Sequence, residues 1–263
     1  MDEPRSTGLV LVADADNTLW DTDSVFADAQ LDLLAQVEAA TGVACRAEGR
    51  LEFVRNYDQA LASRHHLHLR YPVQMLISAL EAALTRSLPP VDAAIDAIAG
   101  RLQGGSILSP DSVERASAAY GEALARTPML LPSVREGLDL ALASGARLYV
   151  MTEGRIEKQK RLIATHHLSD VFADVWELTK DDAQFERLRR RFEGSTVVVI
   201  GDQPDRDIAP ARKAGCVAIL VPSRFRPEWH SGAAWETADH VANTFLEAVT
   251  WCVGSLEIDR GPA

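Results

Sequence analysis

The stretch from Thr7 to Leu19 reads Thr-Gly-Leu-Val-Leu-Val-Ala-Asp-Ala-Asp-Asn-Thr-Leu and joins an apolar run to a polar cluster. The run is continuous and rich in β-formers, which is typical of a strand buried on both faces of a parallel sheet. Two carboxylates, Asp14 and Asp16, follow it directly. In open parallel α/β sheets, ligands bind at the carboxyl ends of the strands. The stretch therefore predicts a buried strand over residues 7–13 that ends at a functional site.

The chain beyond this stretch changes its pattern twice. From about Ser24 to Thr127 it shows only helical patterns, separated by Pro and Gly. After Thr127, strand and helix patterns alternate, which indicates repeated βα units. The helices expected in the first block cover residues 31–40, 51–63, 73–85, 91–102 and 112–126. The second block predicts strands over 147–151, 171–176, 196–200 and 217–221, and helices over 132–144, 156–165, 183–192 and 208–214.

These patterns predict an α/β fold with a doubly wound parallel-sheet, Rossmann-like core. The long helical block separates the first strand from the other strands. The simplest organisation is a core formed by residues 1–23 and 128–263, with an all-helical domain, residues 24–127, inserted after the first strand.

Composition and charge exclude several classes of protein. The 263 residues are 47% hydrophobic and 25% charged, which argues against disorder, and no apolar run approaches the roughly 18–20 residues of a membrane span. A net charge of -11 lacks the basic footprint of a nucleic-acid binder. The polar start, residues 1–8, does not resemble a secretory signal, and Cys45, Cys216 and Cys252 form no CxxC pair. We therefore expect a cytoplasmic monomer or homodimer with no nucleic-acid or membrane partner.

Polar residues follow the other predicted strands as well. Thr152-Glu153-Gly154 comes after the strand over 147–151, and Lys180 follows the strand over 171–176. Gly201-Asp202 and Asp207 follow the strand over 196–200. Carboxylates, a hydroxyl and an amine thus gather at one edge of the sheet, which is the composition of an active site.

The segment Asp14-Ala-Asp16-Asn17-Thr18-Leu19 resembles the DxDGT first motif of the haloacid dehalogenase (HAD) superfamily. Thr152, Lys180 and Gly201-Asp202-x4-Asp207 are similar to its second, third and fourth motifs, in the same order. The helical block resembles the superfamily's C1-type cap domain, so that the likeness covers about residues 8–222. The main departure is Asn17, where most members have Gly. Asn tolerates a positive φ better than other non-Gly residues, so we expect the tight turn to form.

The resemblance implies phosphoryl transfer. It makes Asp14 the nucleophile that forms an aspartyl-phosphate, and Asp16 the general acid and then the general base. Backbone N–H groups of residues 15–18 and the Thr152 hydroxyl would hold the phosphoryl oxygens, and Lys180 would offset negative charge. The residues expected to bind substrate are Asn17, Thr18, Trp20, Glu153 and Gly154.

Magnesium is the cofactor that the resemblance implies, since Mg²⁺ prefers oxygen ligands. Its ligands would be the carboxylates of Asp14 and Asp202 and the backbone carbonyl of Asp16. Asp207 would not contact the metal itself but would orient a metal-bound water or Lys180. Asp205 competes with Asp207 for that position, because the spacing of the fourth motif varies.

Structural interpretations compete with several of these roles. Thr152 precedes a helix and suits an N-cap, Lys180 beside two aspartates suits a solvated surface, and Trp20 suits core packing. Two further stretches are candidates for contact with the substrate: the polar, His-rich stretch of the helical block, residues 56–58 and 64–71, and the segment 224–230. A solvated helix end is the competing interpretation of the His-rich stretch.

The function predicted from these residues is a Mg²⁺-dependent phosphatase that hydrolyses a small phosphomonoester. A carbon–halogen hydrolase on the same scaffold needs neither a metal nor an acid for its leaving group, so Asp16 and the acidic fourth motif argue against it. A phosphonate hydrolase would need a lysine in the cap, and residues 24–127 contain none. A non-catalytic member of the fold and a phosphotransferase remain open alternatives.

Overall fold

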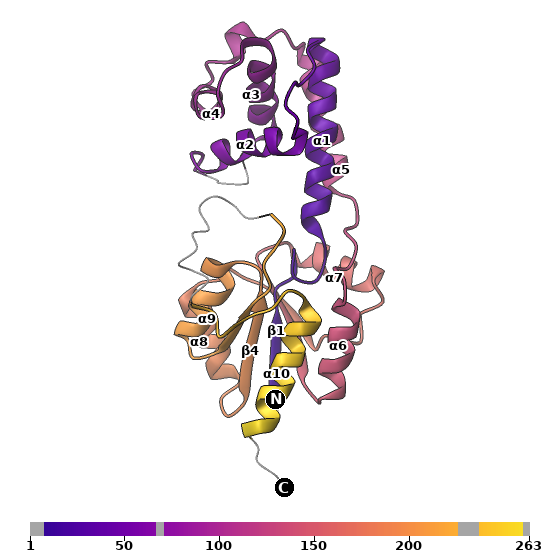
Figure 1. The fold of residues 1–263 in the computed structure, drawn as a ribbon, viewed down its shortest axis with the longest axis vertical. Helices are drawn as coiled ribbons and strands as arrows, with labels where there is room; N and C mark the ends of the chain where they lie inside the picture. The colour runs from indigo at the N-terminus through magenta and orange to yellow at the C-terminus, as the bar shows by residue number, and fades with distance from the viewer. Residues whose placement is uncertain (1–7, 67–70, 226–236, 260–263) are drawn as a thin grey trace. The chain divides into compact units, whose positions relative to one another are not determined.

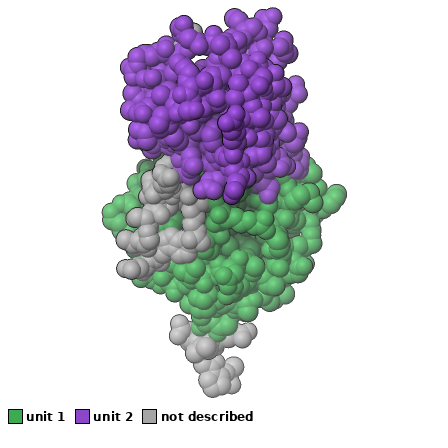
Figure 2. All heavy atoms as spheres, turned by 45° about the horizontal axis from the view of Figure 1, so that its top comes forward, with its two compact units in different colours: residues 1–23, 128–226, 230–263 green, residues 24–127, 227–229 purple. Residues whose placement is uncertain are grey.

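The computed structural model describes residues 8–66, 71–225 and 237–259. They divide into two compact units, shown in green and purple in Figure 2. The first, here called the sheet unit, contains residues 8–23, 128–225 and 237–259, and the second, the helical unit, contains residues 24–127 without 67–70.

Within the described residues, the sheet unit is built on six parallel strands in the order β3-β2-β1-β4-β5-β6 (Figure 1). The central strand pairs with β2 on one side and β4 on the other, and Val12 lies opposite Tyr149 and Val199. The order confirms the predicted doubly wound parallel α/β fold. The strands are β1 (Leu9–Ala13), β2 (Arg147–Thr152), β3 (Asp174–Glu177), β4 (Thr196–Gly201), β5 (Val217–Leu220) and β6 (His240–Val241).

Both faces of the sheet are covered by helices (Figure 1), which explains why β1 is apolar at every position. Leu9, Leu11 and Ala13 belong to the core that the sheet forms with α6 (Val134–Ala143), α7 (Ile156–Thr165) and α10 (Phe245–Asp259). Val10 and Val12 face the other way, toward α8 (Asp182–Arg191), the short helical turn η3 (Pro204–Ile208) and α9 (Ala209–Lys213). Alternating residues of one strand therefore supply two cores.

The helical unit has an apolar core of its own, which includes Leu33, Leu61, Ile77 and Leu80. No strand occurs among residues 24–66 and 71–127. The helices are α1 (Thr22–Thr41), α2 (Arg50–Ala62), α3 (Val73–Arg86), α4 (Pro90–Ile98), the short η2 (Gln103–Gly105) and α5 (Pro110–Leu124). Across the described residues of both units, no helix is long and apolar enough to cross a bilayer.

Four elements differ most from those expected from the sequence, and β3 begins at Asp174 rather than at residue 171. Helix α1 begins nine residues earlier than predicted, because the Asn17 side chain accepts a hydrogen bond from the Asp23 N–H at 2.7 Å and satisfies the first turn. Helix α4 ends at Ile98 rather than at residue 102, and Gly100 beyond it takes a φ of 69°. The edge strand β6 and helix α10 were not predicted.

Candidate active site

The sheet topology brings the ends of β1 and β4 together. The chain runs from β1 to β3 on one side of the sheet and from β4 to β6 on the other, so that the order reverses between β1 and β4. Asp14 follows β1 and donates its N–H to the Ile200 carbonyl of β4 at 2.8 Å. Asp202 follows β4 directly. Both carboxylates therefore lie where open α/β sheets bind their ligands.

A buried cluster of three carboxylates forms at this point. Oxygen atoms of Asp14, Asp202 and Asp207 all lie within 4.8 Å of one another, and the three residues are 6%, 9% and 0% exposed. The Lys180 Nζ lies 2.5 Å from the Asp207 Oδ1 and also contacts the Asp14 Oδ1. With every group ionised, these four side chains carry a combined charge of -2 (three carboxylates and one ammonium).

Asp207 and Asp205 were both candidates for the second acidic residue of the fourth motif, and it is Asp207 that lies in the carboxylate cluster. Its Oδ2 accepts a hydrogen bond from the Gln203 N–H at 3.0 Å, whereas Asp205 is exposed and lies outside the cluster. A Cβ atom at position 201 would overlap the Asp207 side chain, so Gly201 leaves the space that the carboxylate fills. Asp207 thus orients Lys180 from a fully buried position.

Burial and charge shift the pKa of each of three cluster members. Burial raises the pKa of Asp14 to about 7, since the attraction of Lys180 only partly offsets the desolvation. Burial and the neighbouring Asp14 raise the pKa of Asp202 well above its usual range. Burial opposes the charged form of Lys180, but Asp14 and Asp207 outweigh it and raise the pKa of the amine above its usual value. The cluster therefore holds more negative charge than Lys180 alone can stabilise.

The donor set fits a divalent cation that prefers oxygen. The Asp202 Oδ1 is fully buried and has no hydrogen-bond partner in the part of the chain that the structure describes, which costs free energy unless a ligand contacts it. A doubly charged ion would also neutralise the -2 of the cluster. Asp14 and Asp202 offer carboxylate oxygens, and Mg²⁺ is usually bound by proteins through one or two carboxylates.

Asp16 lies apart from the cluster, although it is only two residues from Asp14. Its Oδ1 accepts a hydrogen bond from the Thr22 hydroxyl at 2.7 Å, and its Oδ2 accepts one from the Gln159 Nε2 at 2.9 Å. The Lys158 Nζ is 3.8 Å from the Oδ1, and the Asp16 side chain is 32% exposed. One carboxylate of the first motif is thus desolvated, and the other is hydrogen-bonded and open to solvent.

Gln159 and Thr22 were not among the predicted site residues. Gln159 is fully buried on α7 and also lies 3.5 Å from the Thr152 hydroxyl. A sequence signal for it exists, because Ile156, Gln159 and Ile163 share one helical face, where a polar residue is unexpected. A polar residue on an inward-facing stripe indicates a buried hydrogen-bonding partner.

The second motif lies at the end of a strand, and the third lies in the loop between β3 and α8. Thr152 is the last residue of β2 and is 1% exposed, and Arg155 is the N-cap residue of α7, so the interpretation of Thr152 as an N-cap is wrong. Lys180 is buried, which also contradicts a solvated surface position. Glu153 accepts hydrogen bonds from the Lys180 N–H at 3.1 Å and from Arg206 at 2.8 Å. It therefore ties three loops together at the edge of the sheet.

The first motif turns tightly after Asp14. Asn17 has a φ of 61°, as its place in the motif requires, and its N–H donates to the Trp20 carbonyl at 2.8 Å. The Thr18 Oγ1 lies 3.4 Å from the Asp14 Oδ2, at the long end of a hydrogen bond. Trp20 is fully buried and packs against His166, which favours the core-packing interpretation over the expected contact with substrate. The Asn17 N–H is likewise occupied within the turn.

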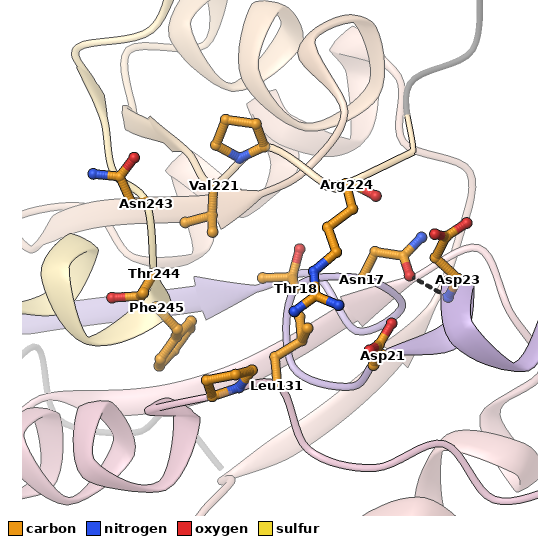
Figure 3. Close-up of a pocket in the computed structure, with 13 residues that line it drawn as sticks. Asn17, Thr18, Asp21, Asp23, Leu131, Val221, Arg224, Asn243, Thr244 and Phe245 are labelled. Atoms are coloured by element: carbon orange, nitrogen blue, oxygen red, sulfur yellow. Dashed lines mark hydrogen bonds between the residues drawn. The ribbon is translucent and has the colours of Figure 1, made fainter.

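A cavity of about 210 Å³ adjoins the first motif on the side of β5 and α10 (Figure 3). Arg224 extends across it toward Asn17 and Thr18, and Asp21 and Asp23 line the same space. The cavity is thus lined by one guanidinium and two carboxylates beside Thr18, and Thr18 contacts Asp14. The remaining lining residues are Leu131, Pro132, Val221, Pro222, Ser223, Asn243, Thr244 and Phe245.

The other candidate stretches are only partly described. Residues 67–70 and 226–230 lie outside the described residues. In the helical unit, the Tyr57 hydroxyl donates to the Leu88 carbonyl at 2.7 Å, and Tyr71 donates to Asp58. His65 is 6% exposed, so this part of the stretch is not a solvated helix end.

The sheet unit is a doubly wound α/β fold with one aspartate after its first strand and with a lysine and two more aspartates at the same edge. One comparison of the sequence with known families agrees with the resemblance to the HAD superfamily. Residues 181–248 match the family model described as HAD-hydrolase-like. No curated protein sequence matches the chain significantly.

Solved structures share the fold over almost the whole chain. A HAD-like family hydrolase from Xanthomonas campestris has 16% sequence identity and a TM-score of 0.59, with 99% of this chain and 97% of that chain covered. A predicted phosphoglycolate phosphatase from Haemophilus somnus 129pt has 17% identity and a TM-score of 0.57, with coverage of 94% and 99%. A Bacillus subtilis protein assigned as a HAD hydrolase and bound to magnesium has 14% identity and a TM-score of 0.57, with coverage of 95% and 100%.

Proposed function

We propose that this protein is a Mg²⁺-dependent phosphatase that hydrolyses a small phosphomonoester through an aspartyl-phosphate. The observation that carries the proposal is the buried cluster of Asp14, Asp202 and Asp207 around Lys180, with Asp16 held outside it. A desolvated nucleophile next to fixed positive charge suits attack on a phosphoryl group. A separate carboxylate, open to solvent, suits proton transfer.

The first half of the reaction uses the two carboxylates of the first motif. A carboxylate oxygen of Asp14 attacks phosphorus, the bond from phosphorus to the ester oxygen breaks, and that oxygen takes a proton from Asp16. In the second half, a water molecule attacks the phosphorus and gives a proton to Asp16. The bond between phosphorus and Asp14 breaks, phosphate leaves, and both carboxyl groups return to their initial state.

Lys180 and the loops around it hold this geometry. The amine compensates the charge of Asp14, and Asp207 fixes the amine from the other side. Asp14 and Asp202, with the Asp16 carbonyl, would hold Mg²⁺, which supplies positive charge for the phosphoryl oxygens. The Thr152 hydroxyl remains the candidate for one phosphoryl oxygen from β2. The cavity of about 210 Å³ beside Thr18 supports a small substrate.

Two features favour a phosphatase over a carbon–halogen hydrolase. A halide leaves without a proton, so that reaction gives no role to a hydrogen-bonded carboxylate in the position of Asp16. It also needs no metal, whereas the buried cluster would carry a charge of -2 with every group ionised, and within the described residues its Asp202 Oδ1 has no hydrogen-bond partner. A phosphotransferase would use the same intermediate, and an alcohol that competes with water as the acceptor would reveal it.

The experiment that tests the proposal measures release of inorganic phosphate from a panel of phosphomonoesters, with Mg²⁺ or with EDTA. Asp14→Asn should abolish turnover, and Asp202→Asn should raise the Mg²⁺ concentration needed for half-maximal activity by tenfold or more. The matched control is Asp205→Asn, the same change three residues away in the same loop, and it should retain activity. Unchanged turnover in Asp14→Asn, or EDTA-insensitive halide release from a 2-haloacid, would refute the proposal.

A further inference from the structure

Gln159 connects the candidate acid–base residue to the core of the sheet unit. It is fully buried in the first turns of α7 and contacts three polar side chains. Its Oε1 accepts a hydrogen bond from the Trp20 Nε1 at 3.0 Å, and its Nε2 donates to the Asp16 Oδ2 at 2.9 Å. A buried amide with both ends engaged is held in one orientation.

The chemistry of the partners fixes which end of the amide faces Asp16. The indole of Trp20 has an N–H and no acceptor, so the atom that meets it must be the amide oxygen. The amide nitrogen must then point the opposite way, toward the carboxylate. Trp20 itself is 0% exposed and stacks on His166 with ring centroids 6.0 Å apart, so its position is set by the core.

The Asp16 carboxylate is held from both sides as a result. The Thr22 hydroxyl donates to its Oδ1 at 2.7 Å, and Gln159 donates to its Oδ2. Gly154 completes the fit, since a Cβ there would lie 3.0 Å from the Gln159 Nε2 and 3.3 Å from the Asp16 Oδ2. General acid catalysis depends on a carboxyl oxygen held within hydrogen-bond reach of the oxygen that it protonates.

We propose that Gln159 is a positioning residue, which holds the Asp16 carboxylate in place for proton transfer and is itself aligned by the indole of Trp20. The inference rests on the proposed phosphatase function and deepens it. Gln159 touches neither the cluster of Asp14, Asp202 and Asp207 nor Lys180 in the hydrogen bonds of the described residues. Its loss should therefore weaken proton transfer and leave Mg²⁺ binding intact.

The test compares two aryl phosphates of similar shape whose leaving groups differ in basicity. The p-nitrophenolate group leaves readily without a proton, whereas the more basic phenolate depends on the acid. Gln159→Met should lower kcat/KM for phenyl phosphate about tenfold more than for p-nitrophenyl phosphate, within the ~10²–10⁴-fold contribution of a general acid. In an Asp16→Asn background, Gln159→Met should cause no further loss with phenyl phosphate. The exposed Gln74→Met, on α3, is the matched control.

Two other measurements separate positioning from a general structural effect. The Mg²⁺ concentration at the midpoint of the metal-induced thermal shift should stay unchanged in Gln159→Met. Trp20→Phe removes the N–H that aligns the Gln159 Oε1, and should show the same selective loss if Gln159→Met does not fold. Equal losses with both aryl phosphates, or a further loss in the Asp16→Asn background, would overturn the inference. A wild-type protein inactive on both compounds with Mg²⁺ would instead contradict the proposed function, and the inference with it.

Discussion

Replacing Lys180 by methionine tests whether the buried charges are balanced as the structure indicates. The change removes the ammonium between Asp14 and Asp207 and keeps an unbranched apolar chain. The side chain of Lys180 is 4% exposed, and those of its two partners are 7% and 1% exposed, so solvent screens this interaction little. Removing one partner of a buried ion pair costs about 3–5 kcal/mol, because the remaining charge is left uncompensated. We expect that loss in the free energy of unfolding, or a fall in Tm of roughly 6–20 °C.

Urea denaturation at pH 8 in EDTA, followed by tryptophan fluorescence, measures the effect. All five tryptophans lie outside residues 24–127, so the signal follows the part of the chain that carries the site. The matched control is Lys213→Met, which removes an exposed ion pair with Asp182 and should leave the urea midpoint unchanged. Adding Asp207→Asn to Lys180→Met should restore part of the lost stability, because one uncompensated charge is removed with it.

A loss of less than about 1 kcal/mol in Lys180→Met, which is the scale of an exposed pair, would contradict a buried ion pair. Equal shifts of the urea midpoint in Lys180→Met and Lys213→Met would contradict it as well. Either result would mean that the cluster is hydrated or already protonated, and that the lysine is not needed to hold it. Lys180→Met should in addition abolish Mg²⁺-dependent phosphate release.

Two further predictions concern pH and packing. Asp14 has a folded-state pKa raised to about 7, so the stability from its protonated form is present at low pH and is lost as the pH rises through 7. In EDTA, Tm should therefore fall between pH 6 and pH 8. The increase in Tm that Mg²⁺ produces should be larger at pH 8 than at pH 6. Asp14→Asn should reduce both the fall in Tm and the pH dependence of the Mg²⁺ effect. An equal Mg²⁺ effect at the two pH values would contradict this. Gly201→Ala forces a Cβ into the Asp207 side chain and should lower the free energy of unfolding by about 1–3 kcal/mol and remove most of the activity. The control Gly121→Ala, with no atom within 4 Å of the added Cβ, should change neither stability nor activity. Full activity in Gly201→Ala would contradict this packing.

The sheet could be predicted from the sequence because its strands are buried on both faces. Five residues from Leu9 to Ala13 face two cores alternately, so all five are apolar and the run is easy to recognise. The same logic placed polar residues at the strand ends, where the structure brings Asp14, Lys180 and Asp202 together. The edge strand β6 has only two residues, His240 and Val241, and such a short element gives no periodic signal.

The hydrogen-bond partners of the site could not be predicted in the same way. The choice between Asp205 and Asp207 depends on the turn η3. This turn directs the Asp207 side chain to Lys180 and leaves Asp205 exposed. The contact between Gln159 and Asp16 joins residues 143 positions apart, and only the packing of α7 against the sheet creates it. Local patterns identify the chemical groups, but tertiary packing decides their partners.

The two carboxylates of the first motif show how one short turn produces two chemical environments. Asp14 continues the direction of β1 into the buried cluster, where desolvation raises its pKa and Lys180 limits the rise. The chain then turns through Asn17 at positive φ, and Asp16 meets hydroxyl and amide donors at a position open to solvent. Active sites often separate two identical groups in this way, so that one acts as a nucleophile and the other transfers protons. A turn that placed both carboxylates in the cluster would add a fourth negative charge to a site with one lysine, and would leave no group able to exchange protons with water.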